Sequence, residues 1–178
     1  MTISTSTDLK ALGVRAVEMM ADGDLAAFEV VVHPEARNLE DINEPPASRG
    51  RGPAAFYATA LYLREIFADL RWDVHQVVLD EDIITVHTTM SGRQIGTFVS
   101  YGPDARPEQA FPSRGRTFAT TPSHWLRVAD GMIVEHWANR DDLGTSKQLG
   151  WVPPSPWYLL RMMLATRKAR RASTRDRR

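Results

Sequence analysis

The sequence predicts a small α+β domain: a cone-shaped, half-open barrel in which a curved antiparallel sheet and three helices from the N-terminal half enclose a pocket, with an extra C-terminal helix. Apolar residues recur at helical spacing up to about residue 70, and the period then changes to two. The later segments are separated by turn signals typical of antiparallel hairpins. With 178 residues, of which 43% are hydrophobic, the chain can build one core.

Three helices are predicted in the first half. A first helix breaks at Asp22-Gly23-Asp24, and Asp24 then caps a short second helix that ends at His33-Pro34. Pro53 occupies the first turn of a third helix, a position that tolerates proline. The apolar stripe of this third helix comprises Phe56, Ala60, Leu63, Phe67 and Leu70.

The second half is predicted to be mostly strands. Ser91-Gly92 is expected to be a tight turn, residues 102–114 a loop, and Asp130-Gly131 a hairpin. Pro122 is expected to interrupt the pairing of a long strand. The expected strands are 72–79, 83–90, 93–101, 117–128 and 132–140, followed by helices over 142–149 and 157–171.

The Asp130-Gly131 hairpin allows two registers. With a three-residue loop, His124 and His136 face each other. With a two-residue loop, His124 faces Trp137 and shares a face with Asn139 and Asp141.

The charge is unevenly distributed. Residues 161–178 hold eight basic groups and one acid, a net charge of +7, whereas the other 160 residues have a net charge of −7. We expect a cone domain over 1–155 and a C-terminal helix with a basic tail over 156–178. That helix either packs on the domain or on a partner copy, or binds membranes or nucleic acid; we favour packing, and expect no nucleic-acid partner.

Several classes of protein are excluded or disfavoured. The absence of cysteine excludes a disulfide scaffold and a thiol nucleophile. Neither Gly-x-Gly-x-x-Gly nor a P-loop is present, and no metal-ligand pattern is found, so we expect no cofactor and no metal. The chain begins without a signal-peptide pattern and contains no membrane-spanning apolar run, so a cytoplasmic location is expected.

Short segments at characteristic spacing carry a family resemblance over about residues 8–152. They are Arg49-Gly50, Phe67-Ala68-Asp69-Leu70-Arg71-Trp72, Thr88-Thr89-Met90-Ser91-Gly92, Arg127-Val128-Ala129-Asp130-Gly131, Glu135-His136-Trp137, Asp141 and Gln148-Leu149-Gly150. In this order they resemble the SnoaL-like polyketide cyclase (ester cyclase) family of the nuclear transport factor 2-like superfamily.

The resemblance implies cofactor-free ring closure of a polyketide methyl ester by intramolecular aldol condensation, with a pocket aspartate that shuttles the proton. That aspartate corresponds to Asp141, so we predict Asp141 as the catalytic acid–base group. A carboxylate suits this chemistry when an apolar setting raises its pKa. The alternative is that Asp141 is a helix N-cap.

The predicted substrate-binding residues are Gln94, His124, Trp137 and Asn139. Gln94 stands where many members of the family carry histidine; glutamine can orient a carbonyl but does not titrate near neutral pH. The alternative for His124 is a structural histidine of the strand whose hydrogen bonds are satisfied within the protein.

We therefore expect a cyclase or related acid–base enzyme that acts on a small hydrophobic carbonyl compound. The alternatives are a non-catalytic small-molecule-binding domain, or an isomerase or epoxide hydrolase of the same superfamily. An epoxide hydrolase would need two pocket carboxylates bridged by an arginine. We also expect a homodimer through the sheet, because a single-layer sheet without a partner leaves the apolar residues of its outer face exposed to water.

Overall fold

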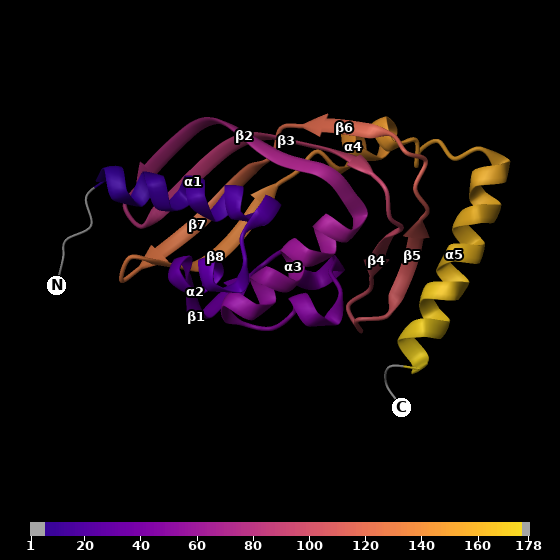
Figure 1. Cartoon of the computed structure of the whole chain (residues 1–178), viewed down its shortest axis with the longest axis horizontal. Coiled ribbons are helices and arrows are strands. Elements are labelled where there is room, and N and C mark those ends of the chain that lie inside the picture. Colours follow the sequence, from indigo (N-terminus) through magenta and orange to yellow (C-terminus); the bar gives the residue numbers. More distant parts are fainter. Residues whose placement is uncertain (1–5, 176–178) are drawn as a thin grey trace.

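A computed structural model of the chain describes residues 6–175 and confirms the α+β architecture. A curved sheet arches over the helices of the N-terminal half (Figure 1). The helices are α1 (Ser6–Asp22), α2 (Leu25–Val31), α3 (Gly52–Ile66), α4 (Asp142–Leu149) and α5 (Pro156–Arg175), with short 3-10 turns η1 (Asp41–Asn43) and η2 (Pro46–Ser48). The strands are β1 (Val32–Asn38), β2 (Phe67–Asp80), β3 (Ile83–Gln94), β4 (Phe98–Tyr101), β5 (Pro107–Phe111), β6 (Thr117–Thr120), β7 (Ser123–Ala129) and β8 (Met132–Asn139).

The main sheet is mixed rather than purely antiparallel, which corrects the prediction. Its order is β1-β8-β7-β3-β2, and β6 pairs with β3 beside β7. The neighbours are antiparallel except for β1, which runs parallel to β8. Strand β1 follows α2 directly in the chain, so its direction in the sheet depends on how α2 packs. Nothing in the sequence of β1 itself predicts that direction. The sheet is not closed into a barrel.

Strand β3 continues through Ser91-Gly92, so the predicted turn there is wrong. Gly92 pairs with Phe118 on β6, and a side chain at Gly92 would come within 3.3 Å of the Ala68 carbonyl oxygen and the Phe118 ring. Glycine is used here because the backbones of neighbouring segments approach closely, not to reverse the chain. The region predicted to be a loop, 102–114, instead contains β5, which pairs with β4 in a separate hairpin.

The third helix ends earlier than its apolar stripe suggested. Helix α3 stops at Ile66, and Phe67 and Leu70 belong to β2. Phe67 is nevertheless buried, against Phe118, with ring centroids 5.0 Å apart. Phe67 and Leu70 both pack in the core, and a strand places their side chains there just as a helix would.

The Asp130-Gly131 hairpin is confirmed with the two-residue loop, in which Ala129 pairs with Met132, but the partner predicted from that loop for His124 is wrong. Both turn residues have positive φ, 50° and 77°, as a two-residue turn of this kind requires. A bulge next to Val128 then adds one residue to β8, so that Trp125 pairs with Trp137 and His124 pairs with Ala138. The bulge places His124 and His136 diagonally on the concave face, where their rings stack with centroids 5.5 Å apart.

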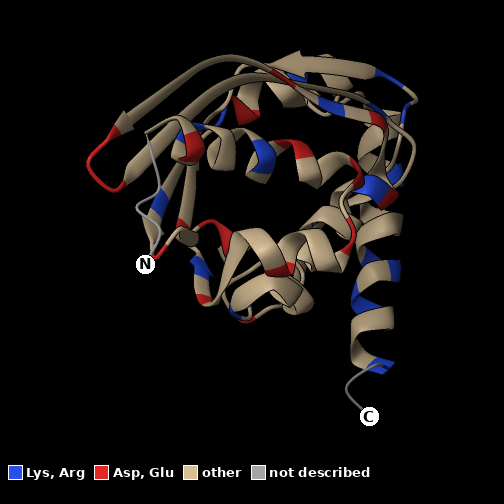
Figure 2. Ribbon diagram, turned by 60° about the vertical axis from the view of Figure 1, so that its left-hand side comes forward, with Lys and Arg blue, Asp and Glu red and all other residues tan. Residues whose placement is uncertain are grey.

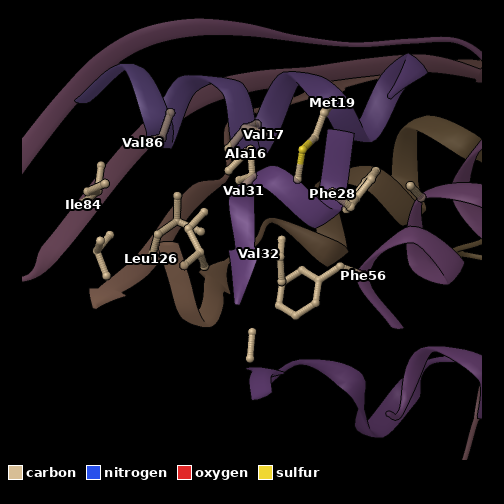
Figure 3. Close-up of a cluster of buried hydrophobic side chains, with 14 of the residues drawn as sticks. Ala16, Val17, Met19, Phe28, Val31, Val32, Phe56, Ile84, Val86 and Leu126 are labelled. Carbon is tan, nitrogen blue, oxygen red and sulfur yellow. The ribbon is translucent and has the colours of Figure 1, made fainter. Parts of the chain in front are cut away.

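The main core lies between the concave face of the sheet and the helices. Asp24 caps α2 as predicted, because its side chain accepts a hydrogen bond of 2.9 Å from the backbone of Ala27. Side chains from α1, α2, α3, β3 and β7 meet in this core (Figure 3). Its members include Val17, Met19, Phe28, Val31, Val32, Phe56, Ile84, Val86 and Leu126.

Helix α5 packs beside the β4–β5 hairpin, at the end of the molecule far from α1 (Figure 1). Tyr158 and Met162 are buried, and the Tyr158 hydroxyl donates to the carbonyl oxygen of Pro112 over 2.9 Å. Basic residues recur along the helix toward its C-terminal end (Figure 2). Within residues 6–175, no helix is both long enough and apolar enough to cross a membrane.

Candidate functional site

A cavity with two chambers lies between the sheet, α3 and the loop before α3. The outer chamber has a volume of about 400 Å³ and the inner chamber about 140 Å³. Residues that line both chambers mark the junction between them. They are Glu40, Glu44, Thr59, Leu63, Met90, His124 and Arg140.

Aromatic side chains line much of the outer chamber. Phe98 and Phe111 stack on Trp151, with ring centroids 5.2 and 4.6 Å away. Tyr62 also lines this chamber, and its hydroxyl hydrogen bonds with the backbone N–H and carbonyl of Val99. A flat, largely apolar molecule would find a stacking surface on this side of the cavity.

The carboxyl group of Glu44 sits at the junction of the two chambers. The Thr59 hydroxyl lies 2.6 Å from its Oε2, and the side-chain amide of Asn38 donates to its Oε1 over 3.4 Å. Burial raises the pKa of Glu44 above its ordinary value, and the hydrogen bonds from Thr59 and Asn38 and the charge of Arg140 only partly oppose this. The result is a carboxyl group that can exchange a proton closer to neutral pH.

Arg49 holds the loop that carries Glu44. Its guanidinium donates to the backbone carbonyls of Ile42 and Glu44 over 2.7 and 3.0 Å. It also donates to Gly102 and Pro103, between β4 and β5, over 2.8 and 3.2 Å. A planar group with five N–H donors suits this task, since it can bind several carbonyls at once. Arg49 of the Arg49-Gly50 segment thus has a clear structural role, which is to hold the loop that carries Glu44 in place.

A chain of hydrogen bonds runs from the sheet edge to the cavity. His124 Nδ1 lies 3.2 Å from His136 Nε2, and His136 Nδ1 lies 2.9 Å from the side-chain oxygen of Asn38. Burial lowers the pKa of His124 to about 4, and Arg140 adds to the shift. Burial also lowers the pKa of His136 to about 3, with His124 and Arg140 contributing. Both imidazoles are therefore neutral at pH 7.

Arg140 bridges two acids that line the outer chamber. Its guanidinium lies 3.2 Å from Glu40 and 3.5 Å from Asp142. The Asp142 side chain is 76% exposed, whereas that of Glu40 is 24% exposed. The cavity thus contains an Arg-bridged acid pair, separate from Glu44.

Asp141 lines the outer chamber and also caps α4. Its Oδ1 accepts a hydrogen bond of 2.7 Å from the backbone N–H of Gly144, and the residue is exposed. The geometry of an N-cap is therefore present. The catalytic role predicted for Asp141 stays a prediction.

Of the predicted substrate-binding residues, His124 lines the cavity. Gln94 is fully buried outside both chambers, where its amide donates to Gly96 and Phe111 and accepts a hydrogen bond of 3.1 Å from the Trp151 indole. It joins β3 to β5 and to the segment after α4. A direct contact of Gln94 with a ligand would require this network to open.

Trp137 and Asn139 alternate with the cavity-lining residues of β8 and so project from the opposite face of the sheet. Trp137 stacks on Trp125 with centroids 6.1 Å apart, and the Trp125 indole donates to the Asn139 side chain over 2.8 Å. Their predicted role in binding stays a prediction, and in this arrangement they form a surface of the convex face.

Sequence reasoning missed Glu44, Thr59, Asn38 and Arg140 as site residues. Glu44 precedes Pro45-Pro46 in a loop and has no periodic pattern around it. Its burial depends on Arg49 and on the distant β4–β5 hairpin. Thr59 was a possible signal, because it is a polar residue one position from the apolar stripe of α3. In residues 6–175, no three acidic or histidine side chains are grouped so that they could hold a metal ion.

Comparisons with known proteins place the chain among polyketide cyclases by sequence and by fold. The family model described as SnoaL-like polyketide cyclase matches residues 11–149. Aklanonic acid methyl ester cyclase DnrD of Streptomyces peucetius is 30% identical over 159 residues, which are 87% of this chain and 99% of that protein. Aklanonic acid methyl ester cyclase DauD of Streptomyces sp. (strain C5) is 31% identical over 159 residues, 87% of this chain and 89% of its own. The solved structure of TsrD from Streptomyces laurentii has a TM-score of 0.65 and 25% identity, covering 82% of this chain and 97% of that chain.

Proposed function

The chain belongs to the SnoaL-like polyketide cyclase family, and we propose that it closes a ring in a polyketide methyl ester by intramolecular aldol condensation, without a cofactor. Two relatives that match most of its length are named as methyl ester cyclases. The outer chamber, with its stacked aromatic wall, is suited to a flat hydrophobic substrate.

The observation that carries the proposal is the position of Glu44 between the chambers. Its carboxyl group faces a hydroxyl and an amide rather than a basic side chain at ion-pair distance. Burial raises its pKa, so the ionised form is a stronger base than an exposed carboxylate. A base of this kind is needed to remove a proton from a carbon next to carbonyl groups.

The proposed reaction needs one protein group that removes a proton and later returns it. Ionised Glu44 takes a proton from a carbon flanked by two carbonyls, and the resulting carbanion attacks a ketone carbon of the same molecule. A carbon–carbon bond forms, and the electron pair of the ketone double bond moves to its oxygen. That oxygen then takes the proton back from Glu44, so the product is an isomer of the substrate and the enzyme returns to its starting state.

Asp141 is the competing candidate for the same step, from the family resemblance. It lines the outer chamber, but one of its oxygens is occupied as a helix cap. The two assignments predict different variants to be inactive, since Glu44→Gln and Asp141→Asn each remove one base and keep its shape.

The test is turnover of aklanonic acid methyl ester, followed by chromatography and mass spectrometry as a new peak of unchanged mass. We expect wild type to catalyse the reaction, Glu44→Gln to lose roughly 100-fold or more in kcat, and Asp141→Asn to stay within a few-fold of wild type. Loss in Asp141→Asn alone would transfer the role to Asp141. Tight binding without turnover by wild type would instead identify a binding domain.

The Arg-bridged acid pair favours a second candidate function, epoxide hydrolysis. Glu40 and Asp142 flank Arg140 in the manner that such an enzyme requires. We rank it below ring closure because Asp142 is 76% exposed, so bulk solvent reaches the carboxylate that would have to position the attacking water. Formation of a diol from 1-methylcyclohexene oxide, lost in Arg140→Gln, would reverse the ranking.

We further propose that the convex face of the sheet pairs with a second copy. The stacked pair Trp125 and Trp137 and the 46% exposed Val78 lie on this face, and an isologous contact would bury them. Light scattering should give twice the chain mass of 20.0 kDa, and Trp125→Lys should give a monomer. A monomeric wild type at micromolar concentration would contradict the dimer.

A further inference from the structure

The orientation of the Asn38 amide is set by its neighbours. The backbone N–H of Glu40 lies 3.2 Å from the Asn38 side-chain oxygen, and a backbone N–H can only donate. On the other side, the Asn38 amide nitrogen lies 3.4 Å from the Glu44 carboxyl, which accepts. Both contacts place the oxygen of Asn38 toward the backbone of Glu40 and toward His136.

This orientation fixes the tautomers of two histidines in turn. Since the Asn38 oxygen is an acceptor, His136 Nδ1 must carry the hydrogen across their 2.9 Å contact. His136 is neutral, so its Nε2 has a lone pair and accepts from His124 Nδ1 over 3.2 Å. His124 is also neutral, and its one hydrogen is on Nδ1. Its Nε2 is therefore an unprotonated acceptor.

That acceptor has no hydrogen-bond partner in the described part of the chain, although it is shielded from solvent. His124 lines both chambers at their junction. A buried acceptor without a partner is unfavourable unless a bound molecule supplies the donor. The Trp72 side chain, which also lines the inner chamber, likewise has an indole N–H without a partner in residues 6–175.

We infer that His124 Nε2, oriented by His136 and Asn38, accepts a hydrogen bond from a hydroxyl or enol O–H of the substrate. A hydroxyl or enol O–H has the hydrogen that this acceptor requires. A bare carbonyl has no hydrogen to donate to His124. The inference deepens the proposed cyclase function by naming the group that the substrate presents to the inner chamber, next to Glu44.

The tautomer is tested on the wild-type protein, with no variant that could misfold. Long-range proton–nitrogen correlation spectra of protein labelled at histidine nitrogen report which ring nitrogen carries the hydrogen. We expect His124 and His136 both to be protonated at Nδ1 at pH 7. Protonation of His124 at Nε2 would overturn the inference.

The recognition step is tested with 2-hydroxyanthraquinone and unsubstituted anthraquinone, two flat probes that differ by one O–H donor. We expect wild type to bind the hydroxylated probe about tenfold more tightly, the usual scale for one hydrogen bond to a buried acceptor. His124→Phe should abolish this preference while retaining anthraquinone affinity. His33→Phe, which alters a histidine outside the cavity, should keep the preference.

Equal affinities for the two probes in wild type, or an unchanged preference in His124→Phe, would contradict the inference. These binding results do not depend on turnover. A protein that shows the preference but does not cyclise the ester would contradict only the proposed function. A protein that cyclises the ester without the preference would contradict only the role of His124.

Discussion

Replacing Gln94 by leucine should destabilise the fold while leaving the cavity intact. Leucine has a similar volume, so the change removes hydrogen bonds without creating a large cavity. The carbonyls of Gly96 and Phe111 lose the donors that now lie 3.0 and 2.9 Å away, and the Trp151 indole loses its acceptor at 3.1 Å. Because Gln94 is fully buried, water does not replace these partners.

The expected cost follows from three groups that each lose a partner at a fully buried side chain. At about 1 kcal/mol or more for each, the free energy of unfolding should fall by about 3 kcal/mol. For a domain of this size, that corresponds to a decrease in Tm of roughly 6–12 °C. Urea unfolding followed by circular dichroism measures the first quantity, and calorimetry measures the second.

Gln148→Leu provides the matched control. Gln148 also makes two side-chain hydrogen bonds, with the backbone of Ala119, but they are exposed, so water can replace them. We expect a loss below about 1 kcal/mol. A Gln94→Leu protein as stable as Gln148→Leu would refute the reasoning. If Gln94→Leu folds normally but loses ligand affinity, the substrate-binding role predicted for Gln94 would stand instead.

Three further perturbations have defined outcomes. Asp141→Ala should lower the free energy of unfolding by about 1 kcal/mol by removing the α4 cap, whereas Asp141→Asn should preserve it; equal urea midpoints for all three proteins would contradict the cap. Burial lowers the pKa of His124 to about 4 and of His136 to about 3, from 6.5. Between pH 6.5 and these values the unfolded chain binds more protons than the folded protein, so the free energy of unfolding should fall as the pH drops below about 6.5. If the urea midpoint of the double variant His124→Phe/His136→Phe falls between pH 7 and pH 5 as much as that of wild type, these histidines are not the cause. Arg49→Lys should free the loop 41–48, because an ammonium cannot reach four carbonyls; unchanged amide exchange in that loop would contradict its role.

The sequence predicts the secondary structure correctly where the hydrophobic periodicity and the turn residues act over a few neighbouring positions. The alternation after Trp72, the Asp24 cap and the Asp130-Gly131 turn each depend on residues a few positions apart, and all are present. The bulge next to Val128 has no such local signal. It nevertheless decides that His124 lies near His136 rather than opposite Trp137.

The candidate site is less predictable because it is assembled from distant segments. Asn38 is the last residue of β1 and Glu44 lies in the loop after it, whereas Thr59 comes from α3 and His124 and His136 from the hairpin. The residues before Pro45 have no periodicity to indicate burial. Only the packing of Arg49 against the β4–β5 hairpin shows that Glu44 is held inside.

Deuterium exchange tests the proposed proton transfer most directly. A methyl ester analogue without the acceptor ketone cannot close the ring, so in heavy water it reports only removal and return of the proton at the carbon between the two carbonyls. We predict that wild type accelerates deuterium incorporation at that carbon, and that Glu44→Gln does so roughly 100-fold less while binding the analogue equally well. Incorporation by Glu44→Gln at the wild-type rate would contradict the assignment of Glu44 as the base.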